Sequence, residues 1–264
     1  MKIRQTFLGI SQSTLNILES LLFPKKCVKC GQYMEKEQRP GHSPETCFCD
    51  NCLKNGFYPI KEPFCTICGI PYPKSFNHNH RCGNCIKSPL KLGRVRAAAE
   101  YKGIIQDGIK LFKYNSKLSL ARTFESSLFQ SYLKYYAKTP IELLIPMPLH
   151  KKRTKKRGFN QAYMLCRNFE KHYKKSFHQS PAWKLETECL IRIKNTLPQT
   201  GFDIEKRKKN VKKAFGIKHQ DRIKGKHILL IDDVLTTGAT CNEAARMLLK
   251  AGALKVDALV LARA

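Results

Sequence analysis

Acidic residues are scarce in this chain of 264 residues. It has 20 Asp and Glu against 49 Lys and Arg, which gives a formal net charge of +29 and a pI near 9.8. An excess of this size is too large for an ordinary protein surface and predicts contact with nucleic acid or with an anionic membrane surface. We favour nucleic acid, because the basic residues are unevenly placed along the chain.

Long apolar runs are also lacking. No stretch approaches the ~20 apolar residues of a transmembrane helix, and residues 1–24 lack the apolar run and the small-residue cleavage site of a signal peptide. We therefore expect a cytoplasmic protein in a reducing environment. Residues 1–24 show apolar side chains at helical spacing up to Pro24, which predicts an amphipathic helix. We expect it to pack on its own protein, with docking on a membrane surface as the less favoured alternative.

The cysteines lack the secretory context of a disulfide scaffold, so they are expected to bind metal as thiolates. Of 12 cysteines, eight form C-x-x-C pairs, namely Cys27/Cys30, Cys49/Cys52, Cys65/Cys68 and Cys82/Cys85. Two residues between the cysteines of a pair let both sulfurs reach one tetrahedral ion about 2.3 Å away. The spacing predicts two Cys₄ zinc sites. Three isolated cysteines, Cys166, Cys189 and Cys241, are expected to pack in the core.

The pairing of the four C-x-x-C units stays open at this level. The simplest arrangement joins the first two pairs in one site and the last two in the other; the crossed arrangement joins first with third and second with fourth. Cys47 could compete as a ligand, since it lies two residues before Cys49. We expect the zinc to be structural, because a module over 25–90 has too few large aliphatic residues to fold unaided and eight thiolates leave no open position for catalysis.

The segment ILLIDDVLTTGAT (228–240) carries the clearest ligand-binding pattern. Its first four residues predict a strand buried on both faces of a parallel sheet. Asp232 and Asp233 end that apolar run, so we expect them at the carboxyl edge of the sheet, where open α/β folds bind ligands. A loop with Thr236, Thr237, Gly238, Ala239 and Thr240 then leads into a helix, whose first N–H groups can bind an anion. A ribose 5-phosphate satisfies both halves, with its hydroxyls on the carboxylates and its phosphate in the loop.

The remaining sequence predicts an α/β protein. Strands are expected over 95–101 and 143–146 and near the C-terminus from Val256 to Leu261. Helices are expected after 101, over 118–136 and after Gly158, where Asn160 is a plausible cap. The basic stretch between Pro146 and Gly158 is expected to be a loop.

Two segments resemble known motifs. The 228–240 segment resembles the motif of type I phosphoribosyltransferases that binds 5-phosphoribosyl-1-pyrophosphate (PRPP). The stretch PMPLHKKRTKKRGFNQA (146–162) is similar to the signature of the ComF family of competence proteins. The resemblance covers nearly the whole chain, cysteine pairs included. It implies a helix over 1–24, a zinc-binding module over 25–90, and a type I phosphoribosyltransferase-like domain over 91–264, with a parallel sheet flanked by helices.

The same resemblance implies roles for further residues. It places His150, Arg153 and Arg157 near the pyrophosphate of PRPP, which is bound with Mg²⁺. It also makes residues 190–215 a hood over the site, with matches at Arg192, Thr196, Gln199, Arg207, Asn210 and Phe215. The hood alternates cations with occasional aromatic residues, as single-strand binding proteins do, so Phe202 and Phe215 are candidates for base stacking. For Phe215, burial in the core is an equal alternative.

Two functions are compatible with these features. The first is handling of incoming single-stranded DNA in natural transformation, with a retained site for Mg·PRPP and with competence and recombination proteins as further partners. The alternative is an active phosphoribosyltransferase that transfers ribose 5-phosphate to an acceptor that the sequence does not identify. We favour the first, because the charge and the zinc module fit it directly.

Overall fold

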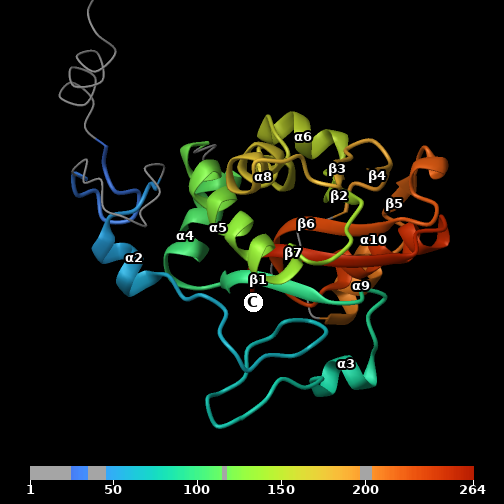
Figure 1. Ribbon diagram of the computed structural model, residues 1–264, viewed down its shortest axis with the longest axis horizontal. Coiled ribbons are helices and arrows are strands. Elements are labelled where there is room, and N and C mark those ends of the chain that lie inside the picture. The colour runs from blue at the N-terminus through green and yellow to red at the C-terminus, as the bar shows by residue number, and fades with distance from the viewer. Residues whose placement is uncertain (1–24, 35–45, 115–117, 197–203) are drawn as a thin grey trace, which may run out of the picture.

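The computed structural model describes residues 25–34, 46–114, 118–196 and 204–264 (Figure 1). The predicted N-terminal helix lies outside the described residues, as do Gln199 and Phe202. Within the described parts of the chain, no helix is long and apolar enough to cross a membrane.

A five-stranded parallel sheet forms the centre of the C-terminal part, with the order β1-β7-β6-β2-β3 (Figure 1). Its strands are β1 (Val95–Glu100), β2 (Leu143–Pro146), β3 (Lys184–Leu185), β6 (His227–Leu235) and β7 (Lys255–Arg263). The predicted α/β class is confirmed, and β2 has the predicted bounds. The two-residue β3 carries too short an apolar pattern to be predicted from the sequence.

The strands are apolar on both faces because helices cover both faces of the sheet. Leu144, Leu229 and Ile231 pack on one side against α4, α5, α7 and α8. Ile145 and Leu230 pack on the other side against α10 and the segment around β4 and β5. The helices of this part are α4 (Gly103–Tyr114), α5 (Ser119–Tyr136), α6 (Lys151–Arg157), α7 (Gln161–Met164), α8 (Phe169–Phe177), α9 (Ile204–Val211), the 3₁₀ helix η1 (Gln220–Arg222) and α10 (Ala239–Lys250).

Strand β6 is longer than the sequence suggested. It continues through Asp232 and Asp233 to Leu235, because its pairing with β7 continues, with Asp232 opposite Val260 and Val234 opposite Ala262. The strand therefore continues beyond the apolar run of residues 228–231, and the carboxylates lie in its carboxyl-terminal part. The expected helix follows as α10, and Gly252 comes directly after its last turn with a positive φ of 94°.

The basic stretch after β2 was expected to be a loop, and most of it is helix α6. His150 caps that helix, since its Nδ1 accepts a hydrogen bond from the backbone N–H of Lys152 at 3.3 Å. Gly158 ends it with a φ of 81°. The predicted cap of the next helix is confirmed, because Asn160 Oδ1 accepts from the N–H of Ala162 at 3.0 Å.

The expected hood is built from an antiparallel pair of short strands and one helix. Strand β4 (Leu190–Arg192) pairs with β5 (Phe215–Ile217), and α9 precedes β5. Phe215 is buried, with 1% of its surface exposed. It therefore cannot stack on a base, and of the two alternatives for Phe215 burial is the correct one. Its apolar ring serves the core beside α10 instead.

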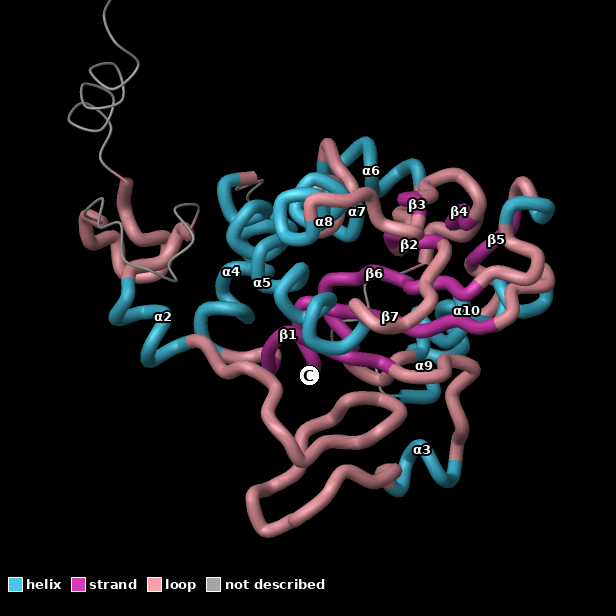
Figure 2. The backbone as a smooth tube through the Cα atoms, viewed as in Figure 1, coloured by secondary structure: helices cyan, strands magenta, loops and turns pink. Residues whose placement is uncertain are grey.

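Two cysteine-rich lobes precede the sheet, and most of their chain is loop (Figure 2). Their helices are α2 (Asp50–Gly56) and α3 (Gly83–Lys87). The lobe that carries α2 lies beside α4 and α5, where the N–H of Cys47 donates to Thr123 Oγ1 at 3.0 Å. The lobe that carries α3 lies against β1, where the N–H of Val95 donates to the carbonyl of Ile67 at 2.6 Å. We call them the first and the second ribbon.

Candidate metal centres and ligand cavity

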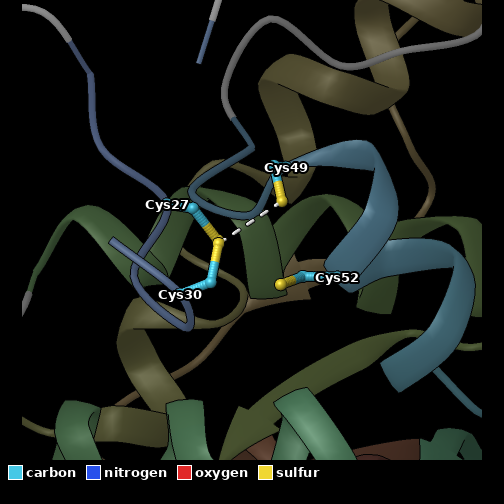
Figure 3. Close-up of side chains that lie close together, drawn as sticks. All are labelled: Cys27, Cys30, Cys49 and Cys52. Atoms are coloured by element: carbon cyan, nitrogen blue, oxygen red, sulfur yellow. Dashed lines mark hydrogen bonds between the residues drawn. The ribbon is translucent and has the colours of Figure 1, made fainter. Parts of the chain in front are cut away.

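Four cysteines of the first ribbon converge on one point (Figure 3). They come from the turn of residues 27–30 and from the start of α2, and they are Cys27, Cys30, Cys49 and Cys52. All four sulfurs lie within 4.8 Å of one another, and the Sγ atoms of Cys30 and Cys49 are 3.7 Å apart. A tetrahedral zinc with Zn–S distances of about 2.3 Å requires sulfurs about 3.8 Å apart. The donor set therefore fits one structural zinc ion.

The second ribbon repeats this arrangement with Cys65, Cys68, Cys82 and Cys85. Its Sγ atoms of Cys68 and Cys82 are also 3.7 Å apart. The pairing of consecutive C-x-x-C units is thus the correct one, and the crossed arrangement is wrong. Cys47 does not join the first set, because its sulfur donates to the carbonyl of Ser119 at 3.2 Å.

One thiol in each set is already biased toward the thiolate form that binds zinc. Burial opposes ionisation of Cys27, but the backbone N–H groups of Cys30, Cys49 and Lys29 outweigh it and lower the pKa of Cys27 to about 6. Cys65 is affected in the same way: N–H groups of its own ribbon overcome burial and lower its pKa to about 6. In each tetrad the backbone N–H groups therefore favour one thiolate.

A cavity of about 500 Å³ opens at the carboxyl ends of β2 and β6. Its lining combines two carboxylates with several cations, and the polar lining residues used below are Lys113, Arg153, Lys156, Arg157, Arg192, Arg207, Asp232, Asp233, Thr236 and Thr240. Its volume lies within the usual range of roughly 300–1,000 Å³ for small-molecule sites. Opposite charges in the lining of one cavity suit a ligand that carries both hydroxyls and phosphates.

Asp232 and Asp233 form the acidic part of the cavity. The ammonium group of Lys113 lies 2.8 Å from Asp233 Oδ2. Asp232 accepts from the N–H of Asp233 at 2.9 Å and from the thiol of Cys241 at 3.7 Å. Burial, and then the charge of Asp233, raise the pKa of Asp232 to about 7. The negative charge of the pair is incompletely balanced, which makes a bound cation or hydroxyl donor favourable there.

Lys113 was not predicted from the sequence. It follows Ile105 and Ile109 at intervals of four residues, so it belongs to the buried stripe of α4. A lysine on the buried side of a helix indicates a functional or ion-paired residue. The signal was missed because Lys113 is one of 49 basic residues. Burial opposes its charge, but the carboxylates of Asp233 and Asp232 outweigh it and raise the pKa of Lys113.

The two arginines of α6 behave differently from its lysines. Arg153 and Arg157 are half-buried and line the cavity, whereas Lys151, Lys152 and Lys155 are exposed. Arg153 Nη2 donates to the carbonyl of Thr196 at 2.6 Å, which ties α6 to the hood. His150 was expected beside the arginines, but its ring is used in capping α6.

The segment of residues 236–240 is divided between two cavities. Thr236 and Thr240 line the cavity of the carboxylates. Thr237 and Ala239 line a neighbouring cavity of about 440 Å³. Gly238 separates them with a φ of 77°, a left-handed conformation that glycine adopts without strain.

The hood contributes two arginines to the cavity, Arg192 and Arg207. Arg192 Nη2 donates to Thr196 Oγ1 at 2.6 Å, and its buried Nε has no hydrogen-bond partner among the described residues. Burial, and then the nearby charge of Arg153, lower the pKa of Arg192 to about 10. An anion in the cavity would stabilise this guanidinium group.

Two domain profiles match the chain. The phosphoribosyl transferase domain matches residues 187–264, and the double zinc ribbon domain matches residues 18–86. Among characterised proteins, Competence protein F of Haemophilus influenzae is 27% identical over 92% of this chain and 98% of its own length. Competence protein ComFC of Bacillus subtilis is 28% identical over 79% of this chain and 80% of its own length.

These comparisons support the resemblance to the ComF family. A third relative, the DNA utilization protein YhgH of Escherichia coli K12, is 29% identical over 75% of this chain and 83% of its own length. The chain combines a phosphoribosyltransferase-like fold with an N-terminal zinc module. Its two cysteine tetrads and the double zinc ribbon match indicate structural zinc.

One buried arginine joins the second ribbon to the ligand cavity. Arg263 Nε donates to the carbonyl of Cys68 at 3.1 Å, and its Nη1 donates to the carbonyl of Thr236 at 2.7 Å. The same guanidinium also contacts Cys68 Sγ at 3.9 Å and the carbonyls of Leu235 and Ala264. A zinc ion with four thiolates carries a net charge of about −2, which explains a buried cation at this point.

Proposed function

We propose that this protein handles incoming single-stranded DNA during natural transformation and binds Mg·PRPP in the cavity of Asp232 and Asp233. The DNA part is supported by the names of its relatives, which refer to competence and DNA utilization, and by its net charge of +29. The PRPP part is supported by one observation: the carboxylate pair and the α6 arginines line the same cavity. A ligand that presents both ribose hydroxyls and a pyrophosphate satisfies both groups.

Each part of PRPP has a proposed partner in the cavity. Asp232 and Asp233 accept hydrogen bonds from the ribose hydroxyls. The 5-phosphate lies at the N-terminus of α10 with Thr236 and Thr240, where backbone N–H groups and the helix dipole favour an anion. Arg153, Arg157 and the buried Arg192 face the pyrophosphate. When it is bound, Mg²⁺ neutralises pyrophosphate charge, and carboxylate-rich sites with phosphate ligands suit that ion.

The DNA part is tested by fluorescence anisotropy of a labelled single-stranded oligonucleotide, titrated across a salt series with and without Mg·PRPP. We expect binding that persists at physiological ionic strength and an apparent affinity that changes about fivefold or more with PRPP, the usual size of coupling between two sites. Binding that disappears as salt rises and does not change with PRPP would contradict the proposal. It would show that the positive charge binds DNA only through nonspecific release of counterions.

The roles of the α6 cations are tested by Arg153→Ala with Arg157→Ala. We expect Mg·PRPP affinity to fall about 10- to 100-fold, because two charge-assisted hydrogen-bonding groups are lost. Lys151→Ala with Lys155→Ala is the matched control, since it removes the same charge from the exposed side of the same helix. Isothermal calorimetry measures both. Equal losses in the two double variants would show that only net charge matters.

An active phosphoribosyltransferase is the second candidate, because the cavity has both carboxylates, both α6 arginines and Thr236 and Thr240 in its lining. In that reaction the acceptor forms a bond to the anomeric carbon while the bond from that carbon to pyrophosphate breaks. The test is release of pyrophosphate from Mg·PRPP with a panel of nucleobases. Release that requires one base would favour this candidate.

A further inference from the structure

The second ribbon carries a cluster of aromatic rings in one exposed loop, which lies between the zinc ligands Cys68 and Cys82. Tyr72 and His80 are stacked, with ring centroids 4.3 Å apart and an interplanar angle of 6°. Phe76 lies against both, with its centroid 5.2 Å from Tyr72 and 5.4 Å from His80, tilted by 32° to each ring. Phe76 is nevertheless 45% exposed. A large apolar ring is therefore presented to solvent beside a stacked pair.

The loop that presents these rings is held by hydrogen bonds to the body of the ribbon. The N–H of Tyr72 donates to the carbonyl of Pro63 at 2.8 Å, and its hydroxyl donates to the carbonyl of His80 at 3.1 Å. That same carbonyl accepts from the N–H of Thr66 at 3.0 Å, next to the zinc ligand Cys65. The rings are thus fixed before any ligand arrives, so little side-chain entropy is lost on binding.

Cations stand beside the rings. Lys74 lies two residues before Phe76, Arg81 directly follows His80, and both are exposed. Exposed aromatic rings beside flexible cations are the combination that binds single-stranded nucleic acid, since bases stack on the rings while the cations follow the phosphates. A duplex keeps its bases stacked on one another and offers no such face.

We propose that Phe76, supported by Tyr72 and His80, is a stacking platform for the bases of a single-stranded nucleic acid. The inference rests on the proposed DNA function and adds to it the surface that contacts the bases. Base-independent affinity then comes from the overall positive charge, and base-dependent affinity comes from this loop. The hood candidate for stacking, Phe215, is buried, whereas Phe76 is accessible.

A second exposed aromatic pair in the same protein provides a matched control. Phe177, at the end of α8, is 42% exposed and lies 4.5 Å from Tyr173 with a tilt of 36°. Lys174 and Lys175 precede it. Phe177 thus matches Phe76 in exposure and neighbouring charge, but it lies outside the second ribbon and contacts one ring, Tyr173, where Phe76 contacts two.

The experiment uses the full chain with zinc bound and an oligothymidylate of about 12 nucleotides, beside an abasic strand of the same length. Wild type is expected to bind the oligothymidylate more tightly than the abasic strand. Phe76→Leu is expected to weaken oligothymidylate binding at least about fivefold, the lower end for loss of one base–aromatic stack, and to leave abasic binding unchanged. Phe76→Tyr keeps an aromatic face and should retain the affinity, and Phe177→Leu should behave as wild type.

The outcomes separate this inference from the proposed function. Wild type that binds neither strand at physiological salt would overturn both. If wild type binds the oligothymidylate, two results would overturn the platform alone. In the first, Phe76→Leu binds the oligothymidylate as tightly as wild type; in the second, Phe177→Leu loses as much affinity as Phe76→Leu. Zinc content is measured for each variant. Should Phe76→Leu lose zinc, photocrosslinking of 5-iodouracil oligonucleotides to wild type decides: adducts within residues 72–81 support the platform, and adducts confined elsewhere overturn it.

Discussion

Replacing Asp232 and Asp233 together with asparagine is expected to weaken binding of Mg·PRPP by about 30- to 100-fold. A hydrogen bond from a ribose hydroxyl is worth about 1.5–3 kcal/mol to a carboxylate but only about 0.5–1.5 kcal/mol to the neutral amide oxygen of asparagine, and about 1.4 kcal/mol corresponds to a tenfold change in affinity. The difference for two bonds, about 2–3 kcal/mol, accounts for a loss of this size. Asparagine keeps the shape of the side chains and removes their charge, so calorimetric titration with Mg·PRPP measures the electrostatic part.

The same substitution also affects the protein without ligand, because Lys113 loses its carboxylate. A cation left in a partly buried site without its counterion is destabilising, so a lower melting temperature is expected for the double variant. Asp221→Asn is the control, since Asp221 is an exposed carboxylate on η1. If the double variant is folded and binds Mg·PRPP with wild-type affinity, the proposal that Asp232 and Asp233 bind the ribose is contradicted.

Loss of the second zinc site is expected to impair the ligand cavity, whereas loss of the first is not. Cys65→Ser and Cys27→Ser should each lower the zinc content from two ions to about one per chain, since each breaks one tetrad. Only Cys65→Ser should also reduce Mg·PRPP affinity, by about tenfold or more. The reason is Arg263, which bridges Cys68 and the carbonyl of Thr236.

The first ribbon has a different set of contacts. It packs near the beginning of α4, where Ile104 lies against Gly56, and Lys29 pairs with Asp107. Lys113 is more than one helical turn further along α4, so Cys27→Ser should leave Mg·PRPP affinity within about twofold. Metal analysis and calorimetry on the two variants make the comparison. Equal losses of affinity in both would show that zinc acts through global stability.

Arg263→Met separates the bridge from the metal. It keeps the four thiolates of the second ribbon and removes the hydrogen bonds to Cys68 and Thr236. Two zinc ions per chain together with weakened Mg·PRPP binding would assign the effect of Cys65→Ser to this bridge. Unchanged affinity would assign it to unfolding of the ribbon instead.

Local patterns in the sequence were sufficient for several elements. The C-x-x-C spacing predicted two tetrads because the geometry of a chelate depends on residues only three positions apart. The apolar runs at 143–146 and 228–231 predicted central strands because a strand covered on both faces has no polar side. The buried positions of Cys166, Cys189 and Cys241 also followed from their isolation and small apolar side chains.

Other features depended on contacts between distant segments. Strand β6 continues past its carboxylates because β7 continues beside it, and no residue near Asp232 encodes that pairing. The short helix α6 forms where a run of lysines suggested a loop, with His150 as its cap. Phe215 and Phe76 are both aromatic residues in basic segments, and only the folded chain shows that the first is buried and the second exposed.

The sequence by itself determined which residues can bind zinc and which strand carries the carboxylates, because both depend on spacing within a few residues. Only the tertiary structure decided which cysteine pairs share an ion, that Lys113 faces Asp233, and that Arg263 joins a ribbon to the cavity. Lys113 is 120 residues from Asp233, and Arg263 is 195 residues from Cys68. Such distant groups come together only when the core packs, so no local sequence pattern can predict these contacts.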